Sequence, residues 1–203
     1  HVIPNFVVED AEDEHYTVYM RQKYASDGER ILCHISNFRP VKRVDDVLRV
    51  FAKVNAELPS KLILVGDGPD RYHCERLCRE LNLCDQVIFL GKVRDTSHVL
   101  EMADVFLLPS ETESFGLAAL EAMAVGVPVI SSNTGGIPEV NIHGYSGYLS
   151  DVGDIDDMAK NTLELLKPEN HPAFKKQAKL RSEEFSLARI LPMYEELYRK
   201  LVK

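Results

Sequence analysis

Six short apolar runs, each followed by a segment with helical character, constrain the fold of this chain more than any other feature. The runs occupy residues 31–36, 61–65, 87–90, 105–108, 127–131 and 147–149. The helical segments are expected to begin near Val44, Pro69, Thr96, Phe115, Ile137 and Ile155. Strands that alternate with helices predict an α/β fold, with a Rossmann-like parallel sheet of about six strands and helices on both faces.

Three regions are expected along the chain. Residues 1–30 are predicted to form a linker with one short helix, and residues 31–172 are predicted to form the sheet domain. Residues 173–203 are predicted to be helical, with a kink or break at Pro192, because proline cannot donate the helical hydrogen bond. A length of 203 residues fits one domain with appendages.

Composition excludes several classes of partner. The 32 acidic and 24 basic side chains give a net charge of -8, which argues against nucleic acid or an anionic membrane. No apolar run approaches the length that spans a bilayer. The four cysteines form no Cys-x-x-Cys pair and are expected to be reduced thiols in a cytoplasmic protein. A metal site at His73, Cys74 and Cys78 is the minor alternative.

The segment 109–124 carries the most information about function. It follows an apolar run and opens a helix, where free backbone N–H groups and the helix dipole suit a diphosphate. Glu113 precedes this helix, and Glu121 lies about two turns inside it. Such carboxylates can accept hydrogen bonds from the paired hydroxyls of a ribose and a sugar. The expected apolar face of the helix consists of Leu117, Leu120 and Ala124.

An ordered set of motifs resembles one enzyme family over nearly the whole chain. Glu113-x7-Glu121, with Ser-Phe-Gly after the first glutamate, is similar to the signature of the retaining glycosyltransferases of family four, which have the GT-B fold. Further segments resemble the same family in the same order, namely residues 2–5, 64–69, 87–91, 126–130 and 135–140. Residues 36–43 are most similar to the branch that transfers N-acetylglucosamine to L-malate in bacillithiol biosynthesis.

The resemblance implies that the chain is one half of an enzyme. GT-B enzymes place their active site between two Rossmann-like domains, and this sequence resembles the half that binds the donor nucleotide. The implied activity is that of a retaining hexosyltransferase that uses a UDP-sugar, most simply UDP-N-acetylglucosamine. The small acceptor would bind to an N-terminal domain missing from this sequence, so the isolated domain is expected to be inactive. A homo-oligomer is left open.

Other readings remain beside the transferase. A UDP-sugar epimerase of related fold and a non-catalytic nucleotide-sugar-binding module are both compatible with the motifs. An NAD(P)-dependent oxidoreductase is disfavoured, because the first apolar run is not followed by Gly-x-Gly-x-x-Gly. The last helix could cross back to the missing domain or pack on its own domain. Its apolar positions are Leu191, Tyr194, Leu197, Tyr198 and Leu201.

Three residues are expected to serve catalysis. Arg39 and Lys42 follow the first strand, at the rim where open parallel sheets bind ligands, and could neutralise the leaving diphosphate. When the family pattern is aligned on Lys42, Asn37 takes the usual arginine position and Arg39 lies two residues later. The resemblance places Glu113 beside the donor sugar.

A second set of residues is expected to bind the donor. By resemblance, Glu121 binds the ribose hydroxyls, and the backbone near Val93 meets the nucleobase. Arg94 could stack on a uracil ring or pair with a nearby acid. The backbone N–H groups that would hold phosphate and sugar oxygens belong to Ser114, Phe115, Gly116 and Leu117, where the glycine permits close approach.

Two further patterns are given structural interpretations. Asp154-Ile155-Asp156 matches a metal-binding Asp-x-Asp motif, but it lies at an expected helix start, where Asp154 would be the N-cap. The family implies no metal and no other cofactor. The turn Gly66-Asp67-Gly68-Pro69 is expected to connect a strand to a helix rather than to bind phosphate. His34 is expected to be a polar residue without a catalytic partner.

Overall fold

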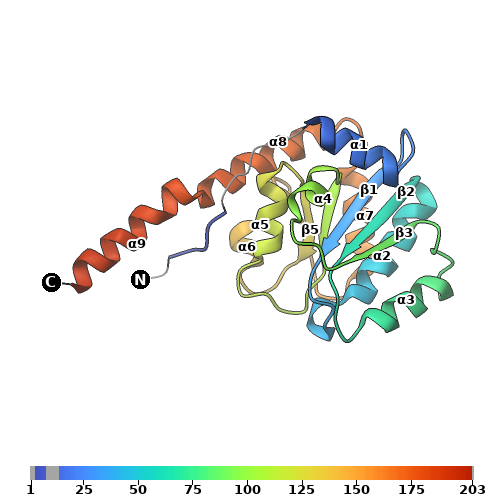
Figure 1. Cartoon of the computed structure of the whole chain (residues 1–203), viewed down its shortest axis with the longest axis horizontal. Helices are drawn as coiled ribbons and strands as arrows, with labels where there is room; N and C mark the ends of the chain where they lie inside the picture. Colours follow the sequence, from blue (N-terminus) through green and yellow to red (C-terminus); the bar gives the residue numbers. More distant parts are fainter. Residues whose placement is uncertain (1–2, 8–13, 203) are drawn as a thin grey trace.

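A six-stranded parallel sheet forms the centre of the molecule (Figure 1). The computed structural model describes residues 3–7 and 14–202. Its strands are β1 (Arg30–Ile35), β2 (Ser60–Val65), β3 (Val87–Gly91), β4 (Val105–Leu108), β5 (Val129–Ser132) and β6 (Gly147–Ser150). Their order across the sheet is β3-β2-β1-β4-β5-β6, and every pairing is parallel. The predicted α/β class and its six strands are confirmed.

Helices cover both faces of this sheet, and one further helix, the C-terminal one, extends away from it (Figure 1). They are α1 (Glu14–Tyr24), α2 (Val44–Glu57), α3 (Arg71–Glu80), α4 (Ser97–Glu101), α5 (Leu117–Ala124), α6 (Ile137–Val140), α7 (Ile155–Leu165), α8 (His171–Ser182) and α9 (Leu187–Leu201), with 3-10 turns η1 (Pro40–Lys42) and η2 (Glu183–Phe185). One core joins the sheet to α2, α3 and α7, and a second core joins it to α4, α5 and α6. The predicted helix starts are correct to within one or two residues.

Strand β1 shows how one sequence supplies both cores. Ile31 and Cys33 belong to the core on the α5 side, whereas Leu32 belongs to the core on the α2 side. All three side chains are fully buried. Successive side chains of a strand point to opposite faces, so a strand covered on both faces must be apolar throughout.

Two glycines let the turn after β2 lie directly against the chain that follows β1. A Cβ atom on Gly66, whose φ is +125°, would lie 1.8 Å from the carbonyl oxygen of Ser36. A Cβ atom on Gly68 would lie 2.4 Å from the carbonyl oxygen of Phe38. The N–H group of Phe38 also donates to the carbonyl of Asp67 at 3.1 Å. This turn connects β2 to α3, and its close approach fixes the path of the segment after β1.

The C-terminal helices differ from the sequence prediction at one point. Of the predicted kink or break at Pro192, the break is wrong, because α9 continues through this residue. The chain breaks instead at η2 and at Ser186, whose extended backbone (φ −66°, ψ 150°) precedes α9. Pro192 removes only its own N–H bond, and the carbonyl four residues earlier belongs to the exposed Ala188, where water can satisfy it.

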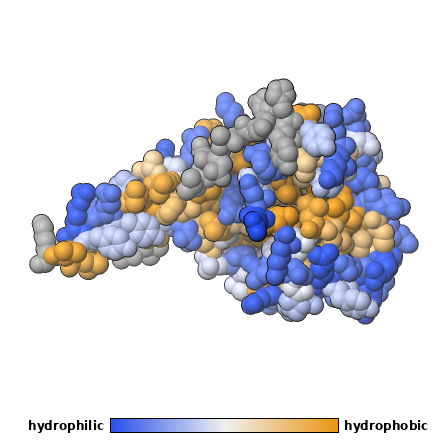
Figure 2. Space-filling model, viewed as in Figure 1, coloured by the Kyte–Doolittle hydropathy of each residue, from blue (hydrophilic) through white to orange (hydrophobic). Residues whose placement is uncertain are grey.

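Helix α9 extends away from the sheet domain, as Figure 1 shows, and Figure 2 shows hydrophobic side chains along it. Its exposed apolar residues are Leu191, Met193, Tyr198 and Leu201. In α9, only Ile190 is a buried residue. The alternative in which the last helix packs on its own domain is therefore not the arrangement found. In the described part of the chain, no helix is both long and apolar enough to span a bilayer.

The close approach at Gly66 can be tested by comparing two alanine substitutions. Gly28 also has a positive φ, +88°, but a Cβ atom there would meet nothing within 4 Å. Gly28→Ala should therefore cost only the backbone strain, about 1–2 kcal/mol. Gly66→Ala adds a clash with a backbone carbonyl and should reduce the free energy of unfolding by on the order of 3 kcal/mol or more. Equal losses in urea denaturation would contradict this account.

Candidate active site

The candidate site lies where the strand order of the sheet reverses. The connections that leave β1 and β4 run to helices on opposite faces, since α2 and α5 belong to different cores. In open parallel sheets, ligands bind outside the carboxyl ends of the strands at such a switch point. The loop after β1 carries Arg39 and Lys42, and the loop after β4 carries Glu113. The topology therefore brings the three predicted catalytic residues to one edge.

An ion pair between Lys42 and Glu113 joins these two loops. The Lys42 ammonium donates to Oε1 of Glu113, and the two side chains are only 21% and 15% exposed. The hydroxyl of the fully buried Ser110 donates to the same oxygen at 3.2 Å. Within the described residues, Oε2 of Glu113 accepts no hydrogen bond. Glu113 is thus held through one oxygen while the other remains able to accept from a ligand hydroxyl.

Two glycines that follow β5 lie directly against the backbone of the loop after β4. A Cβ atom on Gly135 would lie 1.9 Å from the carbonyl oxygen of Glu113. A Cβ atom on Gly136 would lie 2.2 Å from that of Ser114. The N–H group of Gly136 donates to the Glu113 carbonyl at 2.9 Å. The carbonyls of Glu113 and Ser114 therefore face the turn formed by these two glycines.

The start of α5 presents free backbone donors. Gly116, with φ +89°, precedes the first helical residue. Across residues 3–7 and 14–202, no hydrogen bond is donated by the N–H groups of Ser114, Phe115 and Gly116. Consecutive free N–H groups at a helix N-terminus form an anion-binding concavity. The sequence placed these donors correctly at the start of the helix; their ligand remains a prediction.

Leu117 corrects the predicted apolar face of this helix. Its side chain is 43% exposed, whereas Leu120 and Ala124 are buried as expected. Leu117 is the first helical residue, beyond the end of β4, so the sheet does not reach it. The core-facing residues that the prediction missed are Ala119, Ala122 and Met123. Leu117 instead stands beside the free N–H groups.

Glu121 is a half-buried carboxylate with no protein partner. In the described structure it makes neither a hydrogen bond nor an ion pair, and burial raises its pKa above the usual glutamate value. A buried carboxylate without donors is costly, because it loses solvation and gains no hydrogen bond in return. Ligand hydroxyl groups would supply the missing donors.

The predicted nucleobase residues lie farther along the same edge. β3 is two strand positions from β1, about 10 Å across the sheet. Val93 is partly buried and Arg94 is exposed. The alternative that Arg94 pairs with Asp95 or Glu101 is not found: Asp95 accepts from Ser97, and Glu101 accepts from Thr17. Arg39 is also exposed and makes no ion pair among the described residues.

His34 is a site-supporting residue that the sequence analysis did not identify. It is fully buried in β1, where Nδ1 lies 2.8 Å from the Leu107 carbonyl oxygen and Nε2 lies 2.8 Å from the Ser36 hydroxyl. Because a carbonyl only accepts, Nδ1 carries the proton and the serine hydroxyl donates to Nε2. Burial lowers the pKa of His34 to about 4. The neutral ring thus connects β1 to β4 by a hydrogen bond at the switch point. The sequence signal that could have indicated this role is a histidine within an otherwise apolar strand.

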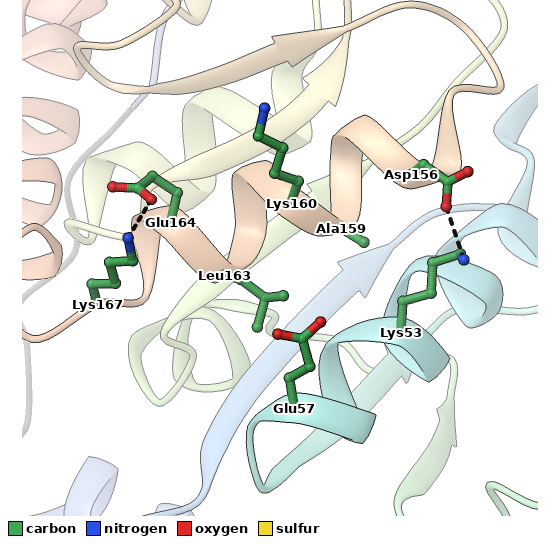
Figure 3. A pocket seen from close by; sticks show the side chains of 8 residues that line it. All are labelled: Lys53, Glu57, Asp156, Ala159, Lys160, Leu163, Glu164 and Lys167. Carbon is green, nitrogen blue, oxygen red and sulfur yellow. Dashed lines mark hydrogen bonds and ion pairs between the residues drawn. The ribbon is translucent and has the colours of Figure 1, made fainter.

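Two other features lie outside the candidate site. A hollow of about 410 Å³ between α2 and α7 is lined by charged side chains, including the exposed pair Lys53–Asp156 at 2.8 Å (Figure 3). None of the predicted site residues lines it. Asp154 caps α7 as predicted, because its Oδ1 accepts from the Asp157 N–H at 2.9 Å. The described residues contain no group of three or more histidine, cysteine or acidic side chains that could hold a metal ion.

Comparisons with known proteins show the family of the chain. Residues 18–183 match the family model of the glycosyl transferases group 1. The chain is 45% identical over 197 residues to the N-acetyl-alpha-D-glucosaminyl L-malate synthase of Bacillus anthracis, covering 96% of this chain and 52% of that protein. It is 36% identical over 149 residues to the D-inositol 3-phosphate glycosyltransferase of Mycolicibacterium smegmatis, covering 70% and 33%.

Two solved structures with bound UDP have the same fold over nearly the whole chain. A point mutant of S. aureus TarM, in complex with Fondaparinux, alpha-GlcNAc-glycerol and UDP, matches with a TM-score of 0.85 and 25% identity, over 98% of this chain and 39% of that one. Anabaena Alr3699/HepE, in complex with UDP and glucose, matches with a TM-score of 0.85 and 22% identity, over 93% and 53%. The chain spans about half the length of the first relatives that it matches.

The buried neutral state of His34 predicts a pH-dependent stability. Below pH 6.5 the unfolded chain protonates this ring, whereas the folded chain stays neutral until about pH 4. The unfolded state then binds more protons, so stability should fall as pH falls through this window, by up to about 3 kcal/mol from this group. Urea denaturation at several pH values should show a shallower loss for His34→Gln than for the native chain. Equal slopes would contradict the assignment.

Proposed function

The chain belongs to the glycosyl transferases group 1 family, and from this premise we propose that it is the donor-binding half of a retaining glycosyltransferase that moves a sugar from a UDP-sugar to a small acceptor. The observation that carries the proposal is the set of unsatisfied groups at the switch point. The N–H groups of residues 114–116 donate no hydrogen bond within the described structure, and they directly follow Glu113, which is paired with Lys42. The carboxylate of Glu121, in the helix that these residues open, has no partner there either. Together they offer cationic, donor and acceptor groups to one ligand.

Each group has a distinct task in this reaction. The leaving diphosphate gains negative charge as the bond to the sugar breaks, and Lys42, Arg39 and the N–H groups stabilise that charge. Interactions that strengthen with the growing charge lower the barrier more than they tighten binding. Oε2 of Glu113 accepts from a sugar hydroxyl, and Glu121 accepts from the ribose. The exposed guanidinium of Arg94 stacks on the base, with the backbone at Val93 beside it.

The relatives support a narrower identity for the two substrates. The donor is UDP-N-acetylglucosamine and the acceptor is L-malate, in keeping with the name of the Bacillus anthracis relative. The acceptor binds to a second domain, since the chain spans about half of that relative's length. Residues 1–30 then link the domains, and residues 173–203 cross back, so that the second domain covers the exposed apolar face of α9.

A binding role without turnover is the second candidate for the chain by itself. It is favoured because the donor groups are assembled here, whereas the chain spans only half of its relatives. The isolated chain should therefore bind UDP without transferring sugar. All four cysteines are free thiols, which supports a reducing compartment such as the cytoplasm.

Donor binding can be tested by titrating UDP into this chain in a calorimeter. The native chain should bind UDP, and Glu121→Gln should weaken binding by on the order of 1.5–3 kcal/mol, through the loss of a charge-assisted hydrogen bond. Glu57→Gln is the matched control, because Glu57 is exposed and lines the hollow of Figure 3. The proposal fails if the folded chain shows no binding at millimolar UDP, or if both variants lose affinity equally.

The proposed charge stabilisation requires no divalent metal. Lys42, Arg39 and the free N–H groups supply positive potential at the diphosphate, while Asp154 acts as a helix cap. EDTA should therefore leave UDP affinity and the turnover of the full-length enzyme nearly unchanged. Asp154→Asn should have little effect on turnover, because asparagine caps helices about as well as aspartate. Activity that collapses in EDTA and returns with Mn²⁺ or Mg²⁺ would contradict this prediction.

A further inference from the structure

Arg43 has a backbone conformation that arginine rarely adopts. Its φ and ψ of 49° and 47° are left-handed. Among the described residues, Asn82 is the one other non-glycine residue with a positive φ, and asparagine tolerates this region well. The left-handed conformation is unfavourable for an arginine, because its Cβ atom crowds the following carbonyl oxygen. Such strain persists only where the surroundings hold it, and it gathers at functional sites.

The strained residue separates two helical segments. Arg43 ends η1, because its N–H group donates to the Pro40 carbonyl at 3.0 Å. It also begins α2, because its carbonyl accepts from the Asp46 N–H group at 2.9 Å. Right-handed helical angles at residue 43 would continue η1 into α2. That change would rotate the turn bearing Lys42 and move its ammonium away from Glu113.

The Arg43 side chain anchors this turn to two other segments. Nε donates to Oδ2 of Asp46 at 2.5 Å, and Asp46 is only 3% exposed. The guanidinium also lies over Gly153, in the loop between β6 and α7, where a Cβ atom would come within 3.1 Å of Nη2. The carboxylates of Asp45 and Glu111 stand near enough to raise the pKa of Arg43 further, after its hydrogen bond to Asp46.

A backbone bond completes the connection to the site. The N–H group of Glu111, in the loop after β4, donates to the Val41 carbonyl at 2.9 Å. The turn that carries Lys42 is therefore held at both ends, by the loop after β4 through Val41 and by Asp46 and Gly153 through Arg43. Lys42 lies between these two attachments, and its ammonium reaches Glu113.

We propose that Arg43 is a positioning residue for sugar transfer. Its ion pair with Asp46 and its contact with Gly153 maintain the left-handed turn that directs Lys42 toward Glu113 and the leaving diphosphate. The inference rests on the proposed function, because it assigns Arg43 an effect exerted through Lys42. Among the described residues, the Arg43 side chain makes no hydrogen bond or ion pair with Glu113 or with any donor-binding residue named above.

The test compares turnover in the full-length enzyme that carries this chain. Lys42→Ala should lower kcat by about 100-fold or more, as expected for the loss of a group that stabilises transition-state charge. Arg43→Ala should lower kcat by about 10- to 100-fold, the effect of a misplacement of about 1 Å, with little change in the KM for the UDP-sugar. Arg43→Gly should lose less than Arg43→Ala, because glycine adopts the left-handed conformation without strain.

Two comparisons separate positioning from general stability. The double variant Lys42→Ala/Arg43→Ala should be no slower than Lys42→Ala alone, since Arg43 has nothing left to position. Lys53→Ala is the matched control: Lys53 is a basic residue of α2, the helix that follows Arg43, and its exposed pair with Asp156 joins α2 to α7 (Figure 3). It should leave kcat unchanged, because exposed ion pairs contribute little.

The outcomes distinguish the positioning role of Arg43 from the proposed leaving-group role of Lys42. If Lys42→Ala is impaired but Arg43→Ala turns over normally, or if the two losses multiply in the double variant, the positioning role is wrong and the proposed function stands. A slower Arg43→Gly than Arg43→Ala would likewise overturn it, because ordinary helix propensity alone predicts that order. If Lys42→Ala retains full kcat, the leaving-group role of Lys42 is wrong, and the positioning role is overturned with it.

Discussion

The ion pair between Lys42 and Glu113 depends on the reversal of strand order between β1 and β4. Adjacent parallel strands whose connections leave toward opposite faces open a gap at their carboxyl ends, and these two side chains meet there. Both are largely shielded from water, so their attraction is screened less than at the surface. Removing either partner would leave a poorly solvated charge. The pair therefore sets the relative position of the two loops on which the proposed chemistry depends.

Close backbone contacts at glycines hold these loops together with backbone hydrogen bonds. Gly66 admits the carbonyl of Ser36 after β1, and Gly135 admits the carbonyl of Glu113 after β4. Because the glycine turn holds the loop after β4 through its carbonyl side, the N–H groups of Ser114 and Phe115 donate to no acceptor in the described structure and are open to a ligand. Preorganised donors of this kind require little rearrangement as charge develops in a reaction. His34 adds a buried tie between the same two strands.

Unsatisfied groups locate the candidate site better than the shape of the surface does. The hollow between α2 and α7 has a volume of about 410 Å³, but the solvent-exposed side chains of Lys53 and Asp156 that line it already form an ion pair with each other. At the switch point, Glu121 is half-buried and has no donor among the described residues, which also supply none to one carboxylate oxygen of Glu113. Burying polar groups without partners costs free energy, so their concentration at one edge of the sheet indicates a ligand site.

The sequence by itself determined the six strands, the helix starts and the Asp154 cap, because apolar periodicity and capping chemistry act between near neighbours. Its motifs also identified the loop residues that meet at the switch point. Only the tertiary structure decided that Leu117 is exposed, that α9 continues through Pro192 and that His34 bonds across to β4. The left-handed turn at Arg43 belongs to the same group. The His34 bond and the Arg43 turn depend on contacts between segments far apart in the chain, whereas the exposure of Leu117 and the continuity of α9 depend on which parts of the folded chain face solvent. Local sequence patterns specify neither.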